Sequence, residues 1–124
     1  MTTIIYLCGL YSLAFALFHI GFWRIFNWKK DLQNLHPVNK AIMQIFNVQG
    51  IYYFLSIAFI CFYCPHELQT TILGKVFLGA ASLFWLVRTI NQLVFLKGND
   101  FRIHLLTLLF ILGTVLFAIP LFQG

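Results

Sequence analysis

Four long apolar segments constrain the fold of this chain more than any other feature. An α-helix needs about 20 apolar residues to cross the hydrocarbon core of a bilayer, and each segment reaches that length. The alternating pattern of barrel strands is absent, so helices are the structure that satisfies the backbone in lipid. We therefore predict an all-α, polytopic membrane protein with transmembrane helices at about 4–26, 41–64, 72–96 and 103–122.

The composition favours lipid over water as the surrounding medium. Hydrophobic residues make up 61% of the 124 residues and charged residues 9%, whereas a soluble domain carries about 25% charged residues. The first apolar segment is too long for a signal peptide and no Ala-x-Ala-like site follows it, so we expect it to remain as a helix. The last four residues, 121–124 (Leu-Phe-Gln-Gly), fit a native end and a tag remnant equally well.

The connections between the predicted helices are short, at residues 27–40, 65–71 and 97–102. Short connections make consecutive helices antiparallel neighbours. The expected architecture is therefore a single integral membrane domain, 1–124, that forms an up-down bundle of four transmembrane helices.

Lys and Arg residues are distributed unevenly among these connections. Most of them lie in or beside segments 27–40 and 97–102, namely Arg24, Lys29, Lys30, Lys40, Lys97 and Arg102. Because short cytoplasmic loops are enriched in Lys and Arg, we expect both segments in the cytoplasm and both termini outside, as in a bacterial inner membrane. The net charge of +5 then faces anionic headgroups, so the expected partners are membrane lipids and not nucleic acid.

Polar side chains inside the apolar segments are costly and indicate a specific role. In the predicted topology they all lie within about 10 Å of the cytoplasmic helix ends, at 1.5 Å per residue. Helical phase places them on stripes that also carry small residues, which face other helices in membranes. We predict that a ligand-binding polar layer is formed by His19, Gln44, Asn47, Arg88, Asn91, Gln92 and His104.

Arg88 is the most informative of these residues because no carboxylate lies in any predicted span. The acidic residues, Asp31, Glu67 and Asp100, all belong to connections. A buried guanidinium without a counter-charge is expensive. Arg88 therefore reaches the surface, pairs with Asp31 or Asp100, binds backbone carbonyls, or holds the acidic group of a ligand.

The other polar residues of the layer each leave two interpretations open. His19 and His104 titrate near neutral pH, and they fit metal or haem ligation or a proton relay as well as hydrogen bonding within the bundle. Two histidines lack the further ligands of a structural zinc site, so no metal site is predicted and no cofactor is assigned. Gln44 and Asn47 fit hydrogen bonds between helices or contacts to a substrate.

Cys61 and Cys64 form a C-x-x-C motif at the outer end of the second predicted helix. In layout this resembles the four-helix membrane oxidoreductases that pass electrons from periplasmic thiols to quinone. That resemblance implies a redox role for the pair. Those enzymes also need a second cysteine pair, and here only Cys8 remains.

The second predicted helix carries Lys40, Asn47 and Gly50 in order. In topology and in this pattern the chain resembles the membrane-associated eicosanoid and glutathione metabolism family. Its second helix has an Arg, and an Asn followed three residues later by a Glu. Here Lys stands for the Arg and the acidic residue is absent. The resemblance implies a trimer and glutathione binding.

Three classes of function remain open. We favour a protein that binds or modifies a lipophilic or anionic small molecule in the polar layer near the cytoplasmic face, without deciding whether it is an enzyme. The first alternative is an oligomeric transporter or channel for small solutes or anions, because a cationic layer favours anions. The second alternative is a non-catalytic scaffold or accessory subunit. A homo-oligomer is expected.

Overall fold

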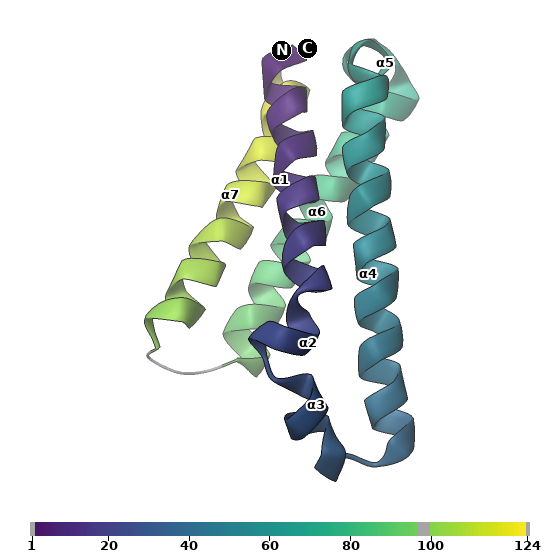
Figure 1. The fold of residues 1–124 in the computed structure, drawn as a ribbon. Coiled ribbons are helices and arrows are strands. Elements are labelled where there is room, and N and C mark those ends of the chain that lie inside the picture. The colour runs from purple at the N-terminus through teal and green to yellow at the C-terminus, as the bar shows by residue number, and fades with distance from the viewer. Residues whose placement is uncertain (1, 97–99, 124) are drawn as a thin grey trace. The chain divides into compact units, whose positions relative to one another are not determined.

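The computed structural model describes residues 2–96 and 100–123, and every regular element in them is a helix. Of the predicted cytoplasmic segment 97–102, Lys97 to Asn99 lie outside the described residues, as does Gly124. In chain order (Figure 1), the elements are α1 (Thr2–Ile20), α2 (Phe22–Ile25), α3 (Trp28–Asp31), the 3-10 helix η1 (Leu32–Asn34), α4 (Pro37–Tyr63), α5 (Pro65–Thr70), α6 (Ile72–Phe95) and α7 (Phe101–Gln123).

Four helices in the described residues are long and apolar enough to cross a membrane: α1, α4, α6 and α7. They contain 19, 27, 24 and 23 residues, which is about 28 to 40 Å at 1.5 Å per residue, against a hydrocarbon core of about 30 Å. The predicted all-α class with four transmembrane helices is confirmed, and the chain is a multi-pass membrane protein.

The helix bounds differ from the predicted ones where flanking residues favour or oppose a helix. α4 begins at Pro37, four residues before the predicted start at 41, because proline suits the first turn of a helix. α1 ends at Ile20 because Gly21 has low helix propensity and its N–H is shared between the carbonyls of Leu17 and Phe18. The connection 65–71 contains a further short helix, α5.

The chain divides into two compact units. One consists of residues 9–60 and is called the N-terminal hairpin; the other consists of residues 1–8 and 61–124 and is called the C-terminal hairpin. Each is described by itself below.

The N-terminal hairpin contains the end of α1 and most of α4, which run antiparallel, with α2, α3 and η1 between them (Figure 1). Asn27 separates α2 from α3 and adopts the left-handed conformation, with φ 52° and ψ 48°. Asparagine tolerates this region better than most residues. Asn27 therefore lets the chain turn between α2 and α3, so that Trp28 and Lys29 follow directly after the turn.

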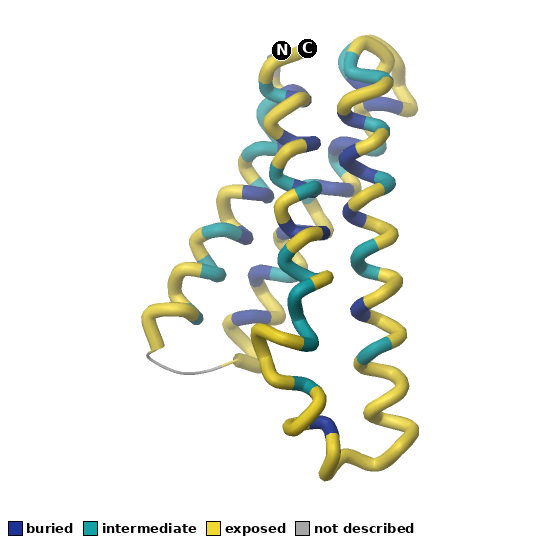
Figure 2. The backbone as a smooth tube through the Cα atoms, in the orientation of Figure 1, coloured by how far each residue is buried: buried dark blue, intermediate teal, exposed yellow. Residues whose placement is uncertain are grey.

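The C-terminal hairpin is built on α6 and α7, which run antiparallel. The rings of Trp85 and Phe110 stack with centroids 5.7 Å apart and an interplanar angle of 20°. Ser82 Oγ donates a hydrogen bond to the carbonyl of Thr114 at 2.7 Å. Buried positions recur along α6, at Gly74, Leu78, Ala81, Trp85, Thr89 and Gln92. Their spacing of three or four residues is that of one helix face. Figure 2 colours the chain by burial.

The junction of α5 and α6 depends on a close backbone approach. Thr71 Oγ1 accepts a hydrogen bond from Gly74 N at 2.9 Å, which caps the N-terminus of α6, and donates one to the carbonyl of Glu67 at 2.7 Å. Gly74 is buried against the backbone of Glu67 and Leu68. The absence of a side chain at residue 74 is what allows α5 to fold back on the first turn of α6.

The start of α7 is stabilised by Asp100. Asp100 Oδ1 accepts a hydrogen bond from Arg102 N at 2.9 Å, and Oδ2 lies 3.3 Å from Arg102 Nη2. The backbone hydrogen bond first, and the Arg102 side chain second, lower the pKa of Asp100 below its usual value. Ionised Asp100 therefore favours the folded helix start at neutral pH, and this contribution is lost as the pH falls through the lowered pKa.

An Arg102→Ala variant should separate the two causes of this lowered pKa. We expect the pKa of Asp100 to rise but to stay below the usual value, because the backbone N–H of residue 102 remains in place. The measurement is an NMR titration of the Asp100 carboxyl carbon in detergent. A pKa at the ordinary value in Arg102→Ala would mean that the guanidinium alone lowers it.

Candidate functional site

In the N-terminal hairpin a pair of hydrogen bonds joins His19 on α1 to Asn47 on α4. Asn47 Nδ2 donates to the carbonyl of His19 at 2.8 Å, and Asn47 Oδ1 lies 2.8 Å from His19 Nδ1. A backbone carbonyl only accepts, which sets the orientation of the amide, and the amide oxygen also only accepts. His19 Nδ1 therefore carries a proton and donates it. The pair fixes both the orientation and the tautomer of the imidazole.

Aromatic rings surround this pair. The His19 ring lies 4.2 Å from the Phe22 ring and 5.2 Å from the Phe54 ring, measured between centroids. Asn47 is 5% exposed. Because this amide is buried, the two hydrogen bonds are the means by which its polar atoms are satisfied.

A second hydrogen bond joins the segment after α1 to α4, closer to the connection at residues 27–36. Trp23 Nε1 donates to Gln44 Oε1 at 2.9 Å, and Gln44 Nε2 donates to the carbonyl of Lys40 at 3.2 Å. On α4, Gln44 precedes Asn47 by three residues, so both side chains lie on the same face of that helix. Trp23 lies on α2, which begins directly after the turn at Gly21. The hydrogen bond from Trp23 holds Gln44 against the indole ring.

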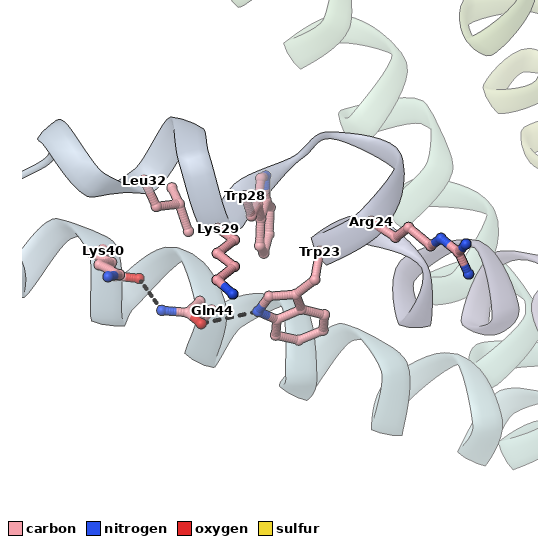
Figure 3. Close-up of a pocket in the computed structure, with 7 residues that line it drawn as sticks. All are labelled: Trp23, Arg24, Trp28, Lys29, Leu32, Lys40 and Gln44. Atoms are coloured by element: carbon pink, nitrogen blue, oxygen red, sulfur yellow. Dashed lines mark hydrogen bonds between the residues drawn. The ribbon is translucent and has the colours of Figure 1, made fainter.

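A pocket of about 470 Å³ lies beside this second hydrogen bond (Figure 3). The side chain of Lys29 extends toward Trp23 and Gln44, whereas the guanidinium of Arg24 points away from the other labelled groups. We call this site the basic-aromatic pocket; its lining residues are Trp23, Arg24, Trp28, Lys29, Leu32, Lys40 and Gln44.

The electrostatics of the basic-aromatic pocket are one-sided. Three of its lining residues are cationic and none is acidic. Within residues 2–96 and 100–123 the one ion pair joins Arg102 to Asp100, so Arg24, Lys29 and Lys40 have no carboxylate partner there. The positive charges of these residues attract an anion to the pocket. The aromatic and aliphatic side chains can pack against the apolar part of a ligand.

Two further predicted site residues, Arg88 and Gln92, lie together in the C-terminal hairpin. Arg88 Nη1 donates to Gln92 Oε1 at 3.3 Å, and the guanidinium carbon lies 4.5 Å from the centre of the Phe110 ring. Gln92 is 1% exposed, and its Nε2 donates to the carbonyl of Ile103 at 3.2 Å. The structure therefore brings Arg88 and Gln92 together on α6 and connects them to the start of α7.

Two predicted site residues belong neither to the hydrogen-bonded pairs nor to the pocket. Asn91 on α6 and His104 on α7 are both exposed. In the described residues no hydrogen bond joins the side chain of either one to the other predicted site residues. Of the predicted polar layer, the structure thus joins His19 with Asn47, places Gln44 beside the pocket, and pairs Arg88 with Gln92.

The cysteines are free thiols. Cys8 and Cys61 are buried and Cys64 is half-buried, at the position just before α5. Cys8 Sγ donates a hydrogen bond to the carbonyl of Leu116 at 3.5 Å. In the described residues no three metal-ligating side chains gather in one place.

Sequence reasoning assigned most of the pocket residues to other roles. The two tryptophans, Trp23 and Trp28, fit an aromatic belt, and the lysines fit the positive-inside rule. The signal that points to a site is the mixture of basic and aromatic residues at 23–29 facing Lys40 and Gln44. Only the fold of α2, α3 and η1 places these separate stretches around one cavity.

Comparison with known proteins adds no further assignment. No protein family, no curated protein and no solved structure matches this chain.

Proposed function

We propose that this membrane protein binds the acidic head of a lipophilic molecule in the basic-aromatic pocket, at the cytoplasmic face of a bacterial inner membrane. The observation that carries the proposal is a pocket whose lining includes Lys29, Lys40 and two tryptophans but no acidic residue. Its volume of about 470 Å³ lies in the range of about 300 to 1,000 Å³ typical of small-molecule sites.

The lining groups match an amphiphilic anion. The ammonium groups of Lys29 and Lys40 donate hydrogen bonds to phosphate or carboxylate oxygens. The indole rings and Leu32 provide apolar surface for the first part of a hydrocarbon tail, and Trp is suited to the boundary between lipid and water. A purely hydrophilic anion would leave this apolar surface unused, which favours a lipophilic ligand.

The proposed orientation rests on the charge distribution of the connections. Segment 27–40 lies in the cytoplasm under the positive-inside rule, and the anionic headgroups there attract basic segments. A ligand that partitions into the membrane reaches a pocket at this depth by diffusing within the leaflet. A homo-oligomer, which we also propose, would contain one such pocket per chain. Each pocket would be complete within its own chain, since all its lining residues belong to residues 23–44.

Removing both lysine charges from the pocket should weaken binding of an anionic amphiphile. We expect the Lys29→Gln/Lys40→Gln variant to bind dodecyl phosphate about tenfold more weakly than the wild type, since each exposed cation contributes up to about 1 kcal/mol. The measurement is isothermal titration calorimetry, with dodecyl phosphate titrated into the protein in a non-ionic detergent.

Two controls define the result. The Lys75→Gln/Arg102→Gln variant loses the same two charges at exposed positions outside the pocket and should bind dodecyl phosphate within about twofold of the wild type. Dodecyltrimethylammonium, with the same tail and the opposite charge, should not compete. Equal affinity of the wild type and the pocket variant would contradict the proposal and favour a non-catalytic scaffold.

A further inference from the structure

Arg88 carries a positive charge inside the C-terminal hairpin, about two helical turns from the end of α6. It lies seven residues before the end of α6 at Phe95, and is therefore about 10 Å from that end. Its side chain is half-buried, and the neighbouring apolar residues Val87 and Ile90 are 53% and 50% exposed. Arg88 thus lies at the edge of the protein surface that faces lipid.

The guanidinium is held in place by its neighbours. Phe110, which is itself stacked on Trp85, lies beneath it at 4.5 Å. Gln92 donates through Nε2 to the carbonyl of Ile103, so that Oε1 is the amide atom left to accept from Arg88. A side chain fixed from two sides loses less freedom when it binds a ligand than a mobile one does.

Most of the hydrogen-bonding capacity of Arg88 remains unused by the described residues. A guanidinium has five N–H donors, and within residues 2–96 and 100–123 the acceptor bonded to it is Gln92 Oε1. No carboxylate in that part of the chain pairs with Arg88. A charge left in this state at the edge of a hydrocarbon core is costly, and an anionic acceptor would offset that cost.

The chain itself does not supply that acceptor. Its acidic residues are Asp31, Glu67 and Asp100, and none lies in a transmembrane helix. A second copy of the chain likewise has no acidic residue in a transmembrane helix. The acceptor with the right depth is the phosphate of a phospholipid, because the long Arg side chain extends toward the headgroups and its planar fork matches phosphate oxygens.

We propose that Arg88, held by Phe110 and Gln92, binds the phosphate group of an anionic phospholipid, forming a lipid site separate from the basic-aromatic pocket. The lipid tails would lie along the exposed apolar residues of α6. The proposal does not depend on the function proposed for the pocket, since it uses no residue of that site.

Native mass spectrometry of the delipidated protein in detergent tests this site. Phosphatidylglycerol is titrated into the Lys29→Gln/Lys40→Gln parent, in which binding at the pocket is weakened, and into the same parent carrying Arg88→Leu or Arg88→Lys. We expect Arg88→Leu to bind about tenfold less tightly, and Arg88→Lys to be intermediate because an ammonium lacks the planar fork. The Arg88→Lys variant keeps the charge, so it remains informative if Arg88→Leu does not fold.

Three controls test whether binding depends on the position of the charge, on the lipid headgroup and on the lipid tails. Arg102→Leu removes the same charge from an 86% exposed side chain and should bind phosphatidylglycerol as the parent does. Phosphatidylcholine with the same tails should bind more weakly, since its choline offsets the phosphate charge. Unchanged phosphatidylglycerol binding in both Arg88 variants would overturn the proposal, as would binding of inorganic phosphate with the same dependence on Arg88.

Discussion

Replacing Gly74 with alanine is expected to lower the free energy of unfolding by about 3 kcal/mol, the upper end for an overpacked site. A Cβ atom at residue 74 would lie 2.5 Å from Leu68 Cα and 2.8 Å from Leu68 C, and closer still to the carbonyl oxygen of Glu67. These are backbone atoms, so no side-chain rotation relieves the overlap. The unfolding midpoint, followed by circular dichroism in detergent, should fall by roughly 10 °C.

Gly50→Ala is the matched control for this variant. Gly50 also lies inside a transmembrane helix, α4, but a Cβ atom there would meet nothing within 4 Å. Because alanine is a better helix former than glycine by up to about 1 kcal/mol, we expect the midpoint to stay the same or rise. A similar fall in both variants would show that loss of any helical glycine is harmful and that the α5–α6 contact is not special.

Replacing Asn47 with leucine is expected to cost about 2 kcal/mol, because two hydrogen bonds of 2.8 Å are lost at once. Leucine has a similar size, so the main change is that the carbonyl and the Nδ1–H of His19 lose these partners. In addition to a lower unfolding midpoint, we expect the indole fluorescence of Trp23 to change, since Gln44 and Asn47 hold the same part of α1 and α2.

Asn91→Leu gives the comparison for Asn47→Leu. It is the same substitution on a transmembrane helix, but Asn91 is exposed. We expect little change or a small gain in stability, because an exposed amide in lipid is replaced by an apolar side chain. If the two variants were destabilised equally, the hydrogen bonds of Asn47 would not be the cause of its effect.

The candidate site was only partly predictable from the sequence. The polar positions Asn47, Gln44 and Gln92 stood out because polar groups are rare in apolar helices. The sequence did not show which of the polar residues pair across helices, because a hydrogen bond between helices depends on distances that helical phase alone does not set. The cavity was missed for the same reason: Trp23, Lys29 and Lys40 each have an ordinary explanation at a membrane boundary.

The all-α class and the number of membrane-spanning helices followed from the sequence alone. Apolar length is a local property, and lipid leaves the backbone no alternative to internal hydrogen bonding, so four runs of about 20 residues predict four membrane-spanning helices. The tertiary structure alone decided which polar atoms meet. His19 with Asn47, Arg88 with Phe110 and Gln92, and the lysines around the pocket depend on turns such as Gly21 and Asn27 and on side-chain packing. The contacts of His19 with Asn47 and of Arg88 with Phe110 join residues far apart in the chain, and no local pattern encodes the distance between them. Arg88 and Gln92 are the exception, because they lie four residues apart on α6.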